Sequence, residues 1–465
     1  LLEKGVPFHQ LTMVKQTAYI RDQSKDVPKN KNWKDITIHS HQNCLEDKKA
    51  FAANFKQVEQ ESNKVIANRI IQNIEENNLI INPPFQTMTE KEIDTSFDLP
   101  FTRLPHPKYK KRGTIPAHEM IKFSINMHRG CFGGCSFCTI SAHQGKFIAS
   151  RSQKSILNEV DQVVDMPGFK GYISDLGGPS ANMYKMKGVV QETCDKCIAP
   201  SCIHPVVCSN LDTSHSQITE IYRKVDKHPK VKKAFIGSGI RHDLLTKSYN
   251  KNADTSINDY MVQLLTRHVS GRLKVAPEHT SADTLKIMRK PSFAHFKEFK
   301  KQFDDIDRKF GLNQQLVPYF ISSHPGCKEE DMVNLAIETK ELGFKLEHVQ
   351  DFTPTPMTVA TVMYYSGYHP YTLKQYYTPK SKTEKINQHR FFFWYKRENQ
   401  NWIRKRLNDA KRPDLLKRLL GSDQKELNQQ VKVGNKAEPK SSERFQRRKN
   451  KTGRINNTEK KRKRQ

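Results

Sequence analysis

Long apolar runs and acidic side chains are both scarce in this sequence. Its 465 residues contain no apolar stretch of about 18 residues, the length that a membrane-spanning helix requires. The first ten residues, LLEKGVPFHQ, contain neither an initiator Met nor the basic-then-apolar order of a signal peptide. We therefore expect no membrane partner, and we expect the first residue to lie inside a longer protein.

The deficit of acidic residues leaves a strongly basic chain. Asp and Glu total 49 against 79 Lys and Arg, a formal net charge of +30. Much of the excess lies in residues 431–465, which include the run KKRKR, and a segment so charged cannot bury a core. We predict a disordered basic tail there. It is either an arm that contacts RNA, DNA or another polyanion, or a solubilising tail.

The nine cysteines are unevenly distributed, which argues against a disulfide framework. They form one group of three and one group of four, and two lie apart: Cys131, Cys135 and Cys138; Cys194, Cys197, Cys202 and Cys208; Cys44 and Cys327. Disulfide scaffolds are typically small secreted domains, whereas clustered cysteines in a large chain more often bind metal. We infer a reducing, cytoplasmic location.

Residues 1–110 read as a mixed lead-in to the rest of the chain. Apolar residues recur at helical spacing over 44–74, and prolines in INPPFQ and LPFTRLPHPKYKKRG then interrupt any long element. This pattern predicts a helix followed by an extended strap or linker.

From about residue 121, strand-like and helix-like segments alternate, which predicts an α/β fold with a parallel sheet. The six predicted strands are 121–130, 171–178, 233–240, 272–279, 314–326 and 347–356. An open doubly wound sheet and a partial (β/α)6 barrel both fit this order, and both place reactive groups at the carboxyl ends of the strands. We assign 111–370 to this core, with a cysteine-bearing insertion at 180–212.

Beyond residue 370 the alternation stops. Residues 371–430 predict a C-terminal helical extension, in which FFFWYKRENQNWIRKRLNDA interleaves aromatic and basic residues. The aromatics either pack a small helical cap against the core or form a base-stacking surface.

The run RGCFGGCSFCTI places Cys131, Cys135 and Cys138 in one loop. Three thiolates can hold three irons of a [4Fe–4S] cluster and leave the fourth iron open. An open iron can chelate the amino and carboxylate groups of S-adenosylmethionine (SAM), and one electron from the cluster then releases a 5′-deoxyadenosyl radical. A zinc site is the alternative, but it needs His143 or His128 as its fourth ligand.

The segment CFGGCSFC resembles the C-x3-C-x-aromatic-C signature of the radical SAM superfamily. The surrounding sequence resembles the YgiQ-type radical SAM proteins over about residues 40–410, through NPP, RLPHPKY, IPAHEMIKFSINMHRG, GYISDLGGPSANMY, LKVAPEHT, LVPYFISSHPG and TPTPMTVATVMYYSG. The resemblance implies a partial (β/α)6 barrel of the radical SAM type. It also implies an upstream domain similar to cobalamin-binding modules, which we expect to be missing from this chain.

The same resemblance implies roles for individual residues. Cys131, Cys135 and Cys138 match the cluster ligands, and Phe137 matches the aromatic residue that lies against the adenine of SAM. The candidates for the remaining cofactor contacts are Gly177, Gly178, Ser238, Arg241 and Glu278. The glycine pair occupies the place of the superfamily's glycine-rich motif, but this sequence has Pro179 where the common form ends in Glu. The polar partner of the glycines is therefore left open.

The second cysteine group, CDKCIAPSCIHPVVC, contains Cys194, Cys197, Cys202 and Cys208, with His204 among them. Four cysteines so close together fit an auxiliary iron–sulfur cluster or a structural zinc, and the spacing does not decide between them. A reduced, unmetallated insertion is the third alternative.

Together these patterns predict an enzyme that binds a [4Fe–4S] cluster and SAM, takes one electron from a flavodoxin- or ferredoxin-like reductant, and abstracts hydrogen from a substrate. The basic surplus makes RNA one candidate substrate, and a metabolite is the other. The competing prediction is a non-catalytic, metal- or iron–sulfur-bearing protein that binds nucleic acid.

Overall fold

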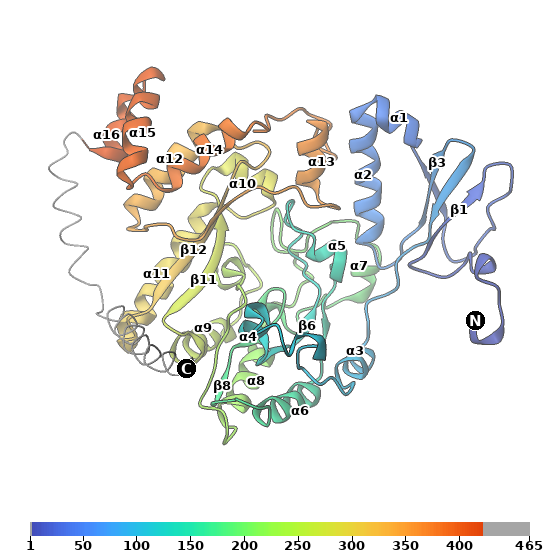
Figure 1. Cartoon of the computed structure of the whole chain (residues 1–465), viewed down its shortest axis with the longest axis horizontal. Helices are drawn as coiled ribbons and strands as arrows, with labels where there is room; N and C mark the ends of the chain where they lie inside the picture. Colours follow the sequence, from blue (N-terminus) through green and yellow to red (C-terminus); the bar gives the residue numbers. More distant parts are fainter. Residues whose placement is uncertain (1, 422–465) are drawn as a thin grey trace, which may run out of the picture. The chain divides into compact units, whose positions relative to one another are not determined.

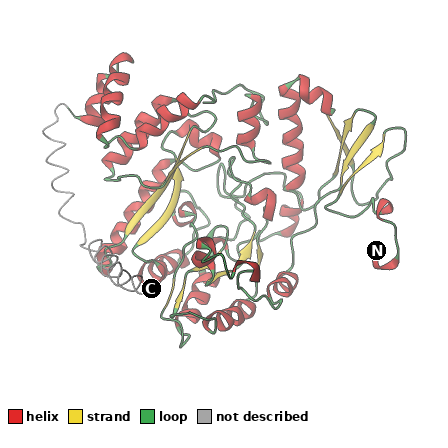
Figure 2. Ribbon diagram, in the orientation of Figure 1, coloured by secondary structure: helices red, strands yellow, loops and turns green. Residues whose placement is uncertain are grey.

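The computed structural model describes residues 2–421. The predicted basic tail and the last part of the predicted helical extension lie outside these residues. The chain divides into two compact units, Leu1–Tyr395 and Lys396–Gln465. Figures 1 and 2 show that strands and helices alternate along the first unit. Over residues 2–421, every helix is too short or too polar to pass through a membrane.

The first unit begins with a four-stranded sheet in the order β1-β4-β3-β2. Its strands are β1 (Ala18–Asp22), β2 (Asp35–Ile38), β3 (Arg69–Ile74) and β4 (Asn77–Ile81). Strand β4 runs antiparallel to both β1 and β3, whereas β2 is parallel to β3. Two helices, α1 (His41–Glu46) and α2 (Lys48–Ser62), connect the parallel pair, as such a pair requires.

This region corrects the predicted end of a helix. The helix predicted over 44–74 ends at Ser62, and residues 69–74 form β3 instead. The side chains of Ile70 and Ile71 are buried, and adjacent β-branched residues favour a strand over a helix. Within the predicted lead-in, residues 18–81 thus fold into a sheet with crossover helices.

The predicted strands of the core neighbour one another in chain order. Strand β5 (Ser124–Asn126) is parallel to β9 (Asp175–Gly177), and β8 (Tyr172–Ile173) is parallel to β10 (Lys233–Ala234). A parallel bridge from Ile240 to Val275 leads to β11 (Arg272–Glu278), β12 (Gln315–Ser322) and β13 (Val349–Asp351), which pair in that order. The α/β class and the parallel pairing are confirmed. A doubly wound sheet reverses its strand order at a switch point, so this consecutive order rules that alternative out.

The strands are shorter than predicted and form separate small ladders. An additional antiparallel pair, β6 (His128–Arg129) and β7 (Ala149–Ser150), flanks the first cysteine group. It interrupts the strand that was predicted over 121–130. The helices of the first unit are α3 (Glu90–Phe97), α4 (Pro116–Ile121), α5 (Ile140–Gln144), α6 (Gln153–Val164), α7 (Gln191–Asp195), α8 (Ser216–Asp226), α9 (Ser256–Gln263), α10 (Ala282–Met288), α11 (Phe293–Phe310), α12 (Glu329–Glu341), α13 (Val359–Ser366) and α14 (Lys382–Phe392).

Local sequence explains where these helices begin and which face they bury. The Ser152 side chain accepts a hydrogen bond from the Ser155 amide, so it caps α6 as predicted. On α6, the side chains of Ile156, Val160 and Val163 recur at helical spacing and are buried.

The aromatic segment that closes the first unit is largely buried. Phe391 and Phe392 are fully buried and Trp394 is 8% exposed, and α14 packs on α12 and β12. The packing interpretation is therefore confirmed for these three side chains, which cannot stack on bases. The second unit contains α15 (Arg397–Asp409) and α16 (Pro413–Leu420).

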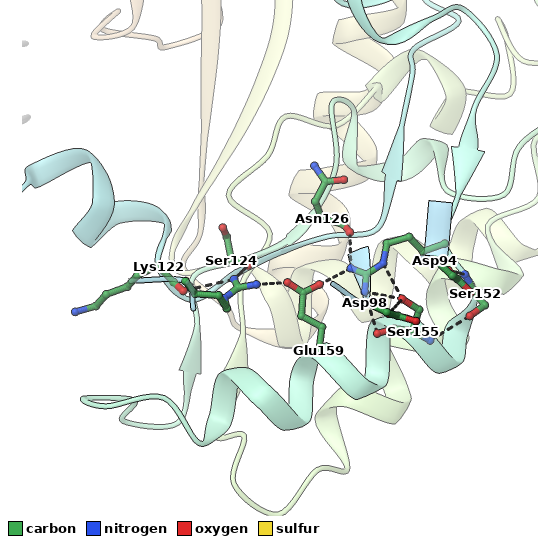
Figure 3. Close-up of polar contacts among 10 residues, drawn as sticks. Asp94, Asp98, Lys122, Ser124, Asn126, Ser152, Ser155 and Glu159 are labelled. Atoms are coloured by element: carbon green, nitrogen blue, oxygen red, sulfur yellow. Dashed lines mark hydrogen bonds and ion pairs between the residues drawn. The ribbon is translucent and has the colours of Figure 1, made fainter. Parts of the chain in front are cut away.

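A buried ionic network fixes the segment that precedes the core (Figure 3). The carboxylate of Glu159 on α6 accepts hydrogen bonds from Arg103 and from Arg151. The guanidinium of Arg151 is fully buried, and it also donates to the carbonyl of Asn126 (3.0 Å) and to the hydroxyl of Ser155 (2.8 Å). Glu159 is the only carboxylate in residues 2–421 that forms an ion pair with Arg151.

Helix α3 and the residue after it extend the same network (Figure 3). The carboxylate of Asp94 accepts from the amide of Ser152 (2.9 Å), and that of Asp98 accepts from the hydroxyl of Ser155 (2.7 Å). The guanidinium of Arg151 lies 4.4 Å from the ring centre of Phe97. The segment 94–103 is thus attached to the start of α6 by charged groups.

The Glu159→Gln variant tests how much this network contributes to the free energy of unfolding. Removing one partner leaves the buried Arg151 charge uncompensated, so we expect a loss of about 3–5 kcal/mol in the free energy of unfolding, measured in urea. The control is Glu220→Gln on α8, which removes an exposed ion pair with Lys224 and should leave the unfolding midpoint unchanged. Equal midpoints for the two variants would show that Arg151 does not depend on Glu159.

Candidate functional site

The first cysteine group lies in a loop that follows β6 and is closed by backbone hydrogen bonds. The amide of Cys131 donates to the carbonyl of Gly145 (3.0 Å), and the amide of Cys138 donates to that of Cys135 (3.1 Å). The loop therefore starts and ends on fixed backbone, which presets the positions of its three thiols.

Ser136, in the middle of this loop, is clamped between two helices. Its amide donates to the carbonyl of Met288 at the end of α10 (3.0 Å), and its carbonyl accepts from the amide of Ala360 on α13 (2.8 Å). Its hydroxyl lies 3.3 Å from Nε2 of His324. The ring of Phe137 stands edge-on to that imidazole, with 5.9 Å between the ring centres. Segments far apart in the sequence thus meet at the loop.

Two glycines of the loop are required by close contacts. A Cβ on Gly133 would lie 2.8 Å from a guanidinium nitrogen of Arg241, and one on Gly134 would lie 2.5 Å from the carbonyl oxygen of Pro200. Gly134 also has a φ of +58°, which favours glycine. The loop is therefore packed between Arg241 and the cysteine-bearing insertion.

Arg241 is buried and places its charge against the loop. Its Nη1 donates to Sγ of Cys135 (3.4 Å), and its Nε donates to Oδ1 of Asp243 (2.9 Å), with a second bond from Nη2 to the other carboxylate oxygen. Burial alone would raise the pKa of Asp243, but the guanidinium beside it holds that pKa well below its usual range. A fixed cation at this position offsets the negative charge that ligand thiolates bring.

Arg289 holds the loop from the side of α2. Its Nη1 and Nη2 donate to the two carboxylate oxygens of Glu59 (2.7 and 2.9 Å), and Nη1 also lies 3.3 Å from the carbonyl oxygen of Gly134. The hydroxyl of Tyr371 donates to the same carboxylate (2.6 Å). Arg289 therefore connects the N-terminal sheet region with the cysteine loop.

The thiols of the loop influence one another electrostatically. Burial raises the pKa of Cys131 and raises that of Cys138 to about 12, and a charge on Cys135 raises both further. The positive charge of Arg241 lowers the pKa of Cys131. At neutral pH, conversion of Cys131 and Cys138 to thiolates therefore requires a strong positive charge such as that of a bound metal.

Glu278 brings a buried carboxylate to the same place. It ends β11 at a β-bulge and has a φ of +69°, a conformation that costs a non-glycine residue on the order of 1–3 kcal/mol. Its Oε1 lies 3.9 Å from Nζ of Lys290. Burial raises its pKa, whereas Lys290 and Arg241 lower it, and its charge in turn raises the pKa of Cys138. The carboxylate therefore faces the cysteine loop.

The predicted glycine pair ends β9 and has no room for side chains. A Cβ on Gly177 would lie 2.7 Å from the Ser238 hydroxyl, and one on Gly178 would lie 2.4 Å from the ring of His128. Asp175 accepts from the amide of Ser238 (3.1 Å) and from its hydroxyl. The Ser238 side chain therefore supports the loop through Asp175.

Several residues at the site were not among the predicted contacts. His128, considered only as a zinc ligand, is fully buried against Gly178, and burial lowers its pKa to about 4. Asp243 and Lys290 accompany the predicted Arg241 and Glu278. Asp243 follows Arg241 by two positions in the loop after the third strand. This spacing in the sequence could have indicated Asp243 as the partner of Arg241.

The donor set consists of three thiols from one loop, adjoined by the buried cation of Arg241. Within residues 2–421, no three His, Cys, Asp or Glu side chains meet at a position for one metal ion. In a [4Fe–4S] cluster held by three cysteines, each thiolate binds a different iron.

The second cysteine group lies directly behind the first. The amide of Cys202 donates to the carbonyl of Phe132 (3.0 Å), and the hydroxyl of Ser201 donates to that of Gly133 (2.8 Å). Cys131 and Cys202 pack against one apolar cluster that contains Phe132 and Ile203. The remaining cysteines lie apart from these groups: Cys44 and Cys327 are buried.

Two family models match the ends of the chain. Residues 1–124 match the model described as Radical SAM N-terminal, and residues 347–465 match a domain of unknown function, DUF3362. A UPF0313 protein of Porphyromonas gingivalis is 56% identical over 416 residues, which is 89% of this chain and 65% of that protein. A UPF0313 protein of Bacteroides thetaiotaomicron is 57% identical over 413 residues, 89% of this chain and 66% of that protein.

This chain belongs to the UPF0313 family. The resemblance to YgiQ-type proteins of the radical SAM superfamily is thereby confirmed. The UPF0313 chain spans about two thirds of the length of these relatives (65% and 66%). Among solved structures, the radical SAM methyltransferase TsrM from Kitasatospora setae, with cobalamin and a [4Fe–4S] cluster bound, is 14% identical. The TM-score is 0.37, over 63% of this chain and 49% of that one.

The contact between Gly178 and His128 can be tested in this UPF0313 chain by Gly178→Ala. Because the added methyl group would overlap the imidazole, we expect a loss of about 1–3 kcal/mol in the free energy of unfolding. The control is Gly239→Ala in the loop after β10, where nothing lies within 4 Å of the added Cβ. An unfolding midpoint for Gly178→Ala as high as that of the control would contradict the close approach of the glycine to the imidazole.

Proposed function

We propose that this chain is a radical SAM enzyme whose cluster is held by Cys131, Cys135 and Cys138. The observation that carries the proposal is the clamped loop of three cysteines, in which the buried guanidinium of Arg241 donates to Sγ of Cys135 (3.4 Å). When bound, the [4Fe–4S] cluster supplies the electron that breaks a C–S bond of SAM and yields a 5′-deoxyadenosyl radical. The UPF0313 and Radical SAM N-terminal matches support this assignment.

The surrounding residues hold the cofactors in place. Arg241 offsets the charge of the thiolates, and the glycine pair Gly177 and Gly178 leaves backbone bare for the methionine part of SAM. The ring of Phe137 would contact the adenine. The buried carboxylate of Glu278 would accept hydrogen bonds from the ribose hydroxyls or the amino group. Ser238 supports the site indirectly, because its hydroxyl donates to Asp175.

We infer that the consecutive parallel strands belong to a partial (β/α)6 barrel around this site, and that the electron comes from a flavodoxin- or ferredoxin-like reductant. The free cysteines in residues 2–421 suit the reducing cytoplasm. The substrate is RNA or a metabolite. The net charge of +30 supports RNA.

A non-catalytic role in binding nucleic acid is the competing function. Its proposed stacking surface would use the aromatics from Phe391 onward, but Phe391, Phe392 and Trp394 are buried. The enzyme is therefore the better supported of the two.

Production of 5′-deoxyadenosine tests the proposal. Protein reconstituted with iron and sulfide without oxygen, then given dithionite and SAM, should release 5′-deoxyadenosine, and Cys135→Ala should abolish the product. The control is Cys44→Ser, because serine can accept the bond that Asn54 donates to Sγ of Cys44 (3.0 Å). Product from Cys135→Ala at the wild-type rate, or zinc at the first cysteine group with no SAM consumed, would refute the enzyme proposal.

The proposed role of Glu278 makes a separate prediction about SAM affinity. The Glu278→Gln variant should bind SAM roughly ten- to a hundredfold more weakly, because it loses a hydrogen bond to a charged group. The affinity is measured by calorimetry on cluster-loaded protein. Iron content should stay that of the wild type. The control is Glu347→Gln, which removes an exposed ion pair with Arg272 at the other end of β11. Unchanged SAM affinity in Glu278→Gln would remove this residue from the site.

A further inference from the structure

A buried lysine that no carboxylate neutralises lies against the insertion. Lys146, just before β7, is 1% exposed. Its Nζ donates to the carbonyl oxygen of Ala199 (2.7 Å) and to Sγ of Cys197 (3.4 Å), and it forms no ion pair with a carboxylate within residues 2–421. A buried ammonium without a counter-charge costs several kcal/mol. The polar partners of this cation are thus a carbonyl and a cysteine sulfur.

The four cysteines of the insertion lie close to this cation. Lys146 lines one cavity together with Cys194, Cys202 and Cys208, and its Nζ donates to Sγ of Cys197 (3.4 Å). Neutral thiols would leave the ammonium uncompensated. Four thiolates bound to a metal keep a net negative charge, and that charge would neutralise Lys146.

The backbone around the thiols is also shaped for them. A Cβ on Gly188 would lie 2.2 Å from Sγ of Cys194, so that thiol occupies space that any other residue would fill. The side-chain amide of Asn210 donates, through Nδ2, to the same sulfur (3.5 Å) and to the carbonyl of Val190 (2.9 Å). Hydrogen bonds to sulfur are characteristic of the surroundings of iron–sulfur clusters.

There is room beside the thiols for more than one metal atom. A cavity of about 470 Å³ is lined by Lys146, Cys194, Cys202 and Cys208. Cys197 lies beside Lys146, outside the lining of this cavity. In the described part of the chain the thiols do not converge on one ion position. An iron–sulfur cluster and zinc are both thiophilic centres that four thiolates can hold.

We propose that Cys194, Cys197, Cys202 and Cys208 hold a second metal centre, for which Lys146 is the counter-cation. The shared chemistry is a thiophilic metal on four thiolates, as an iron–sulfur cluster or as zinc. The proposal is independent of the radical SAM assignment, because it concerns a different set of thiols. Lys146 is a positioning residue that touches a ligand and not the metal.

Metal analysis in a background without the first site tests the proposal. The full chain with Cys131→Ala, Cys135→Ala and Cys138→Ala, purified and reconstituted without oxygen, should still hold metal, and adding Cys197→Ser should remove it. Iron with acid-labile sulfide would identify a cluster, and one zinc per chain would identify a mononuclear centre. Absence of bound metal from the background protein, folded by circular dichroism, would overturn the proposal. That result would leave 5′-deoxyadenosine production by the wild type unaffected.

The role of the lysine has its own test in the same background. Lys146→Met should lower metal affinity roughly 10- to 100-fold, as loss of an outer-shell partner does, and Lys146→Arg should restore most of it. Without metal, Lys146→Met should be at least as stable as its parent, because a buried unpaired charge is gone. The matched control is Lys187→Met, an exposed lysine on the same cavity. Parental metal affinity in Lys146→Met would overturn the assignment of Lys146.

Discussion

The contact between the guanidinium of Arg241 and the cysteine loop organises the site. The loop can approach so closely only because Gly133 has no side chain, and the guanidinium can stay buried only because Asp243 binds it through two hydrogen bonds. The backbone amide of Arg241 is in turn held by the side chain of Asn182 (2.7 Å). A buried charge without these partners would be costly, so the loop after β10 and the cysteine loop must form together.

The two cysteine groups share the same supports. The insertion donates three hydrogen bonds to two carbonyls of the CFGG segment, and both groups pack on one apolar cluster. A residue that keeps the insertion in place therefore also shapes the wall of the first loop. Pro200, whose carbonyl oxygen leaves no room for a side chain at Gly134, shows this directly.

Local signals were sufficient for part of the structure. The Ser152 cap and the alternation from residue 121 each depend on neighbours in the sequence, and the start of α6 and the parallel order of the strands followed from them. The role of the three closely spaced cysteines stays a prediction. The sheet before residue 81 was missed because the helical spacing of apolar residues continues into β3, where pairing with β2 and β4 decides the conformation. Lys146 and Arg289 were missed for a similar reason. Arg289 and its partner Glu59 lie 230 residues apart, and nothing in the sequence around either residue indicates the other.

The pair of Glu59 and Arg289 has a mechanical consequence. Glu59 belongs to α2, and Arg289 contacts the carbonyl oxygen of Gly134, within the CFGG segment. Arg289 is buried, Glu59 is 15% exposed, and two hydrogen bonds join them, so a movement of α2 would displace the loop or break a charged contact. A force applied to the first hundred residues would therefore be transmitted through Glu59 and Arg289 to the loop that carries the three thiols.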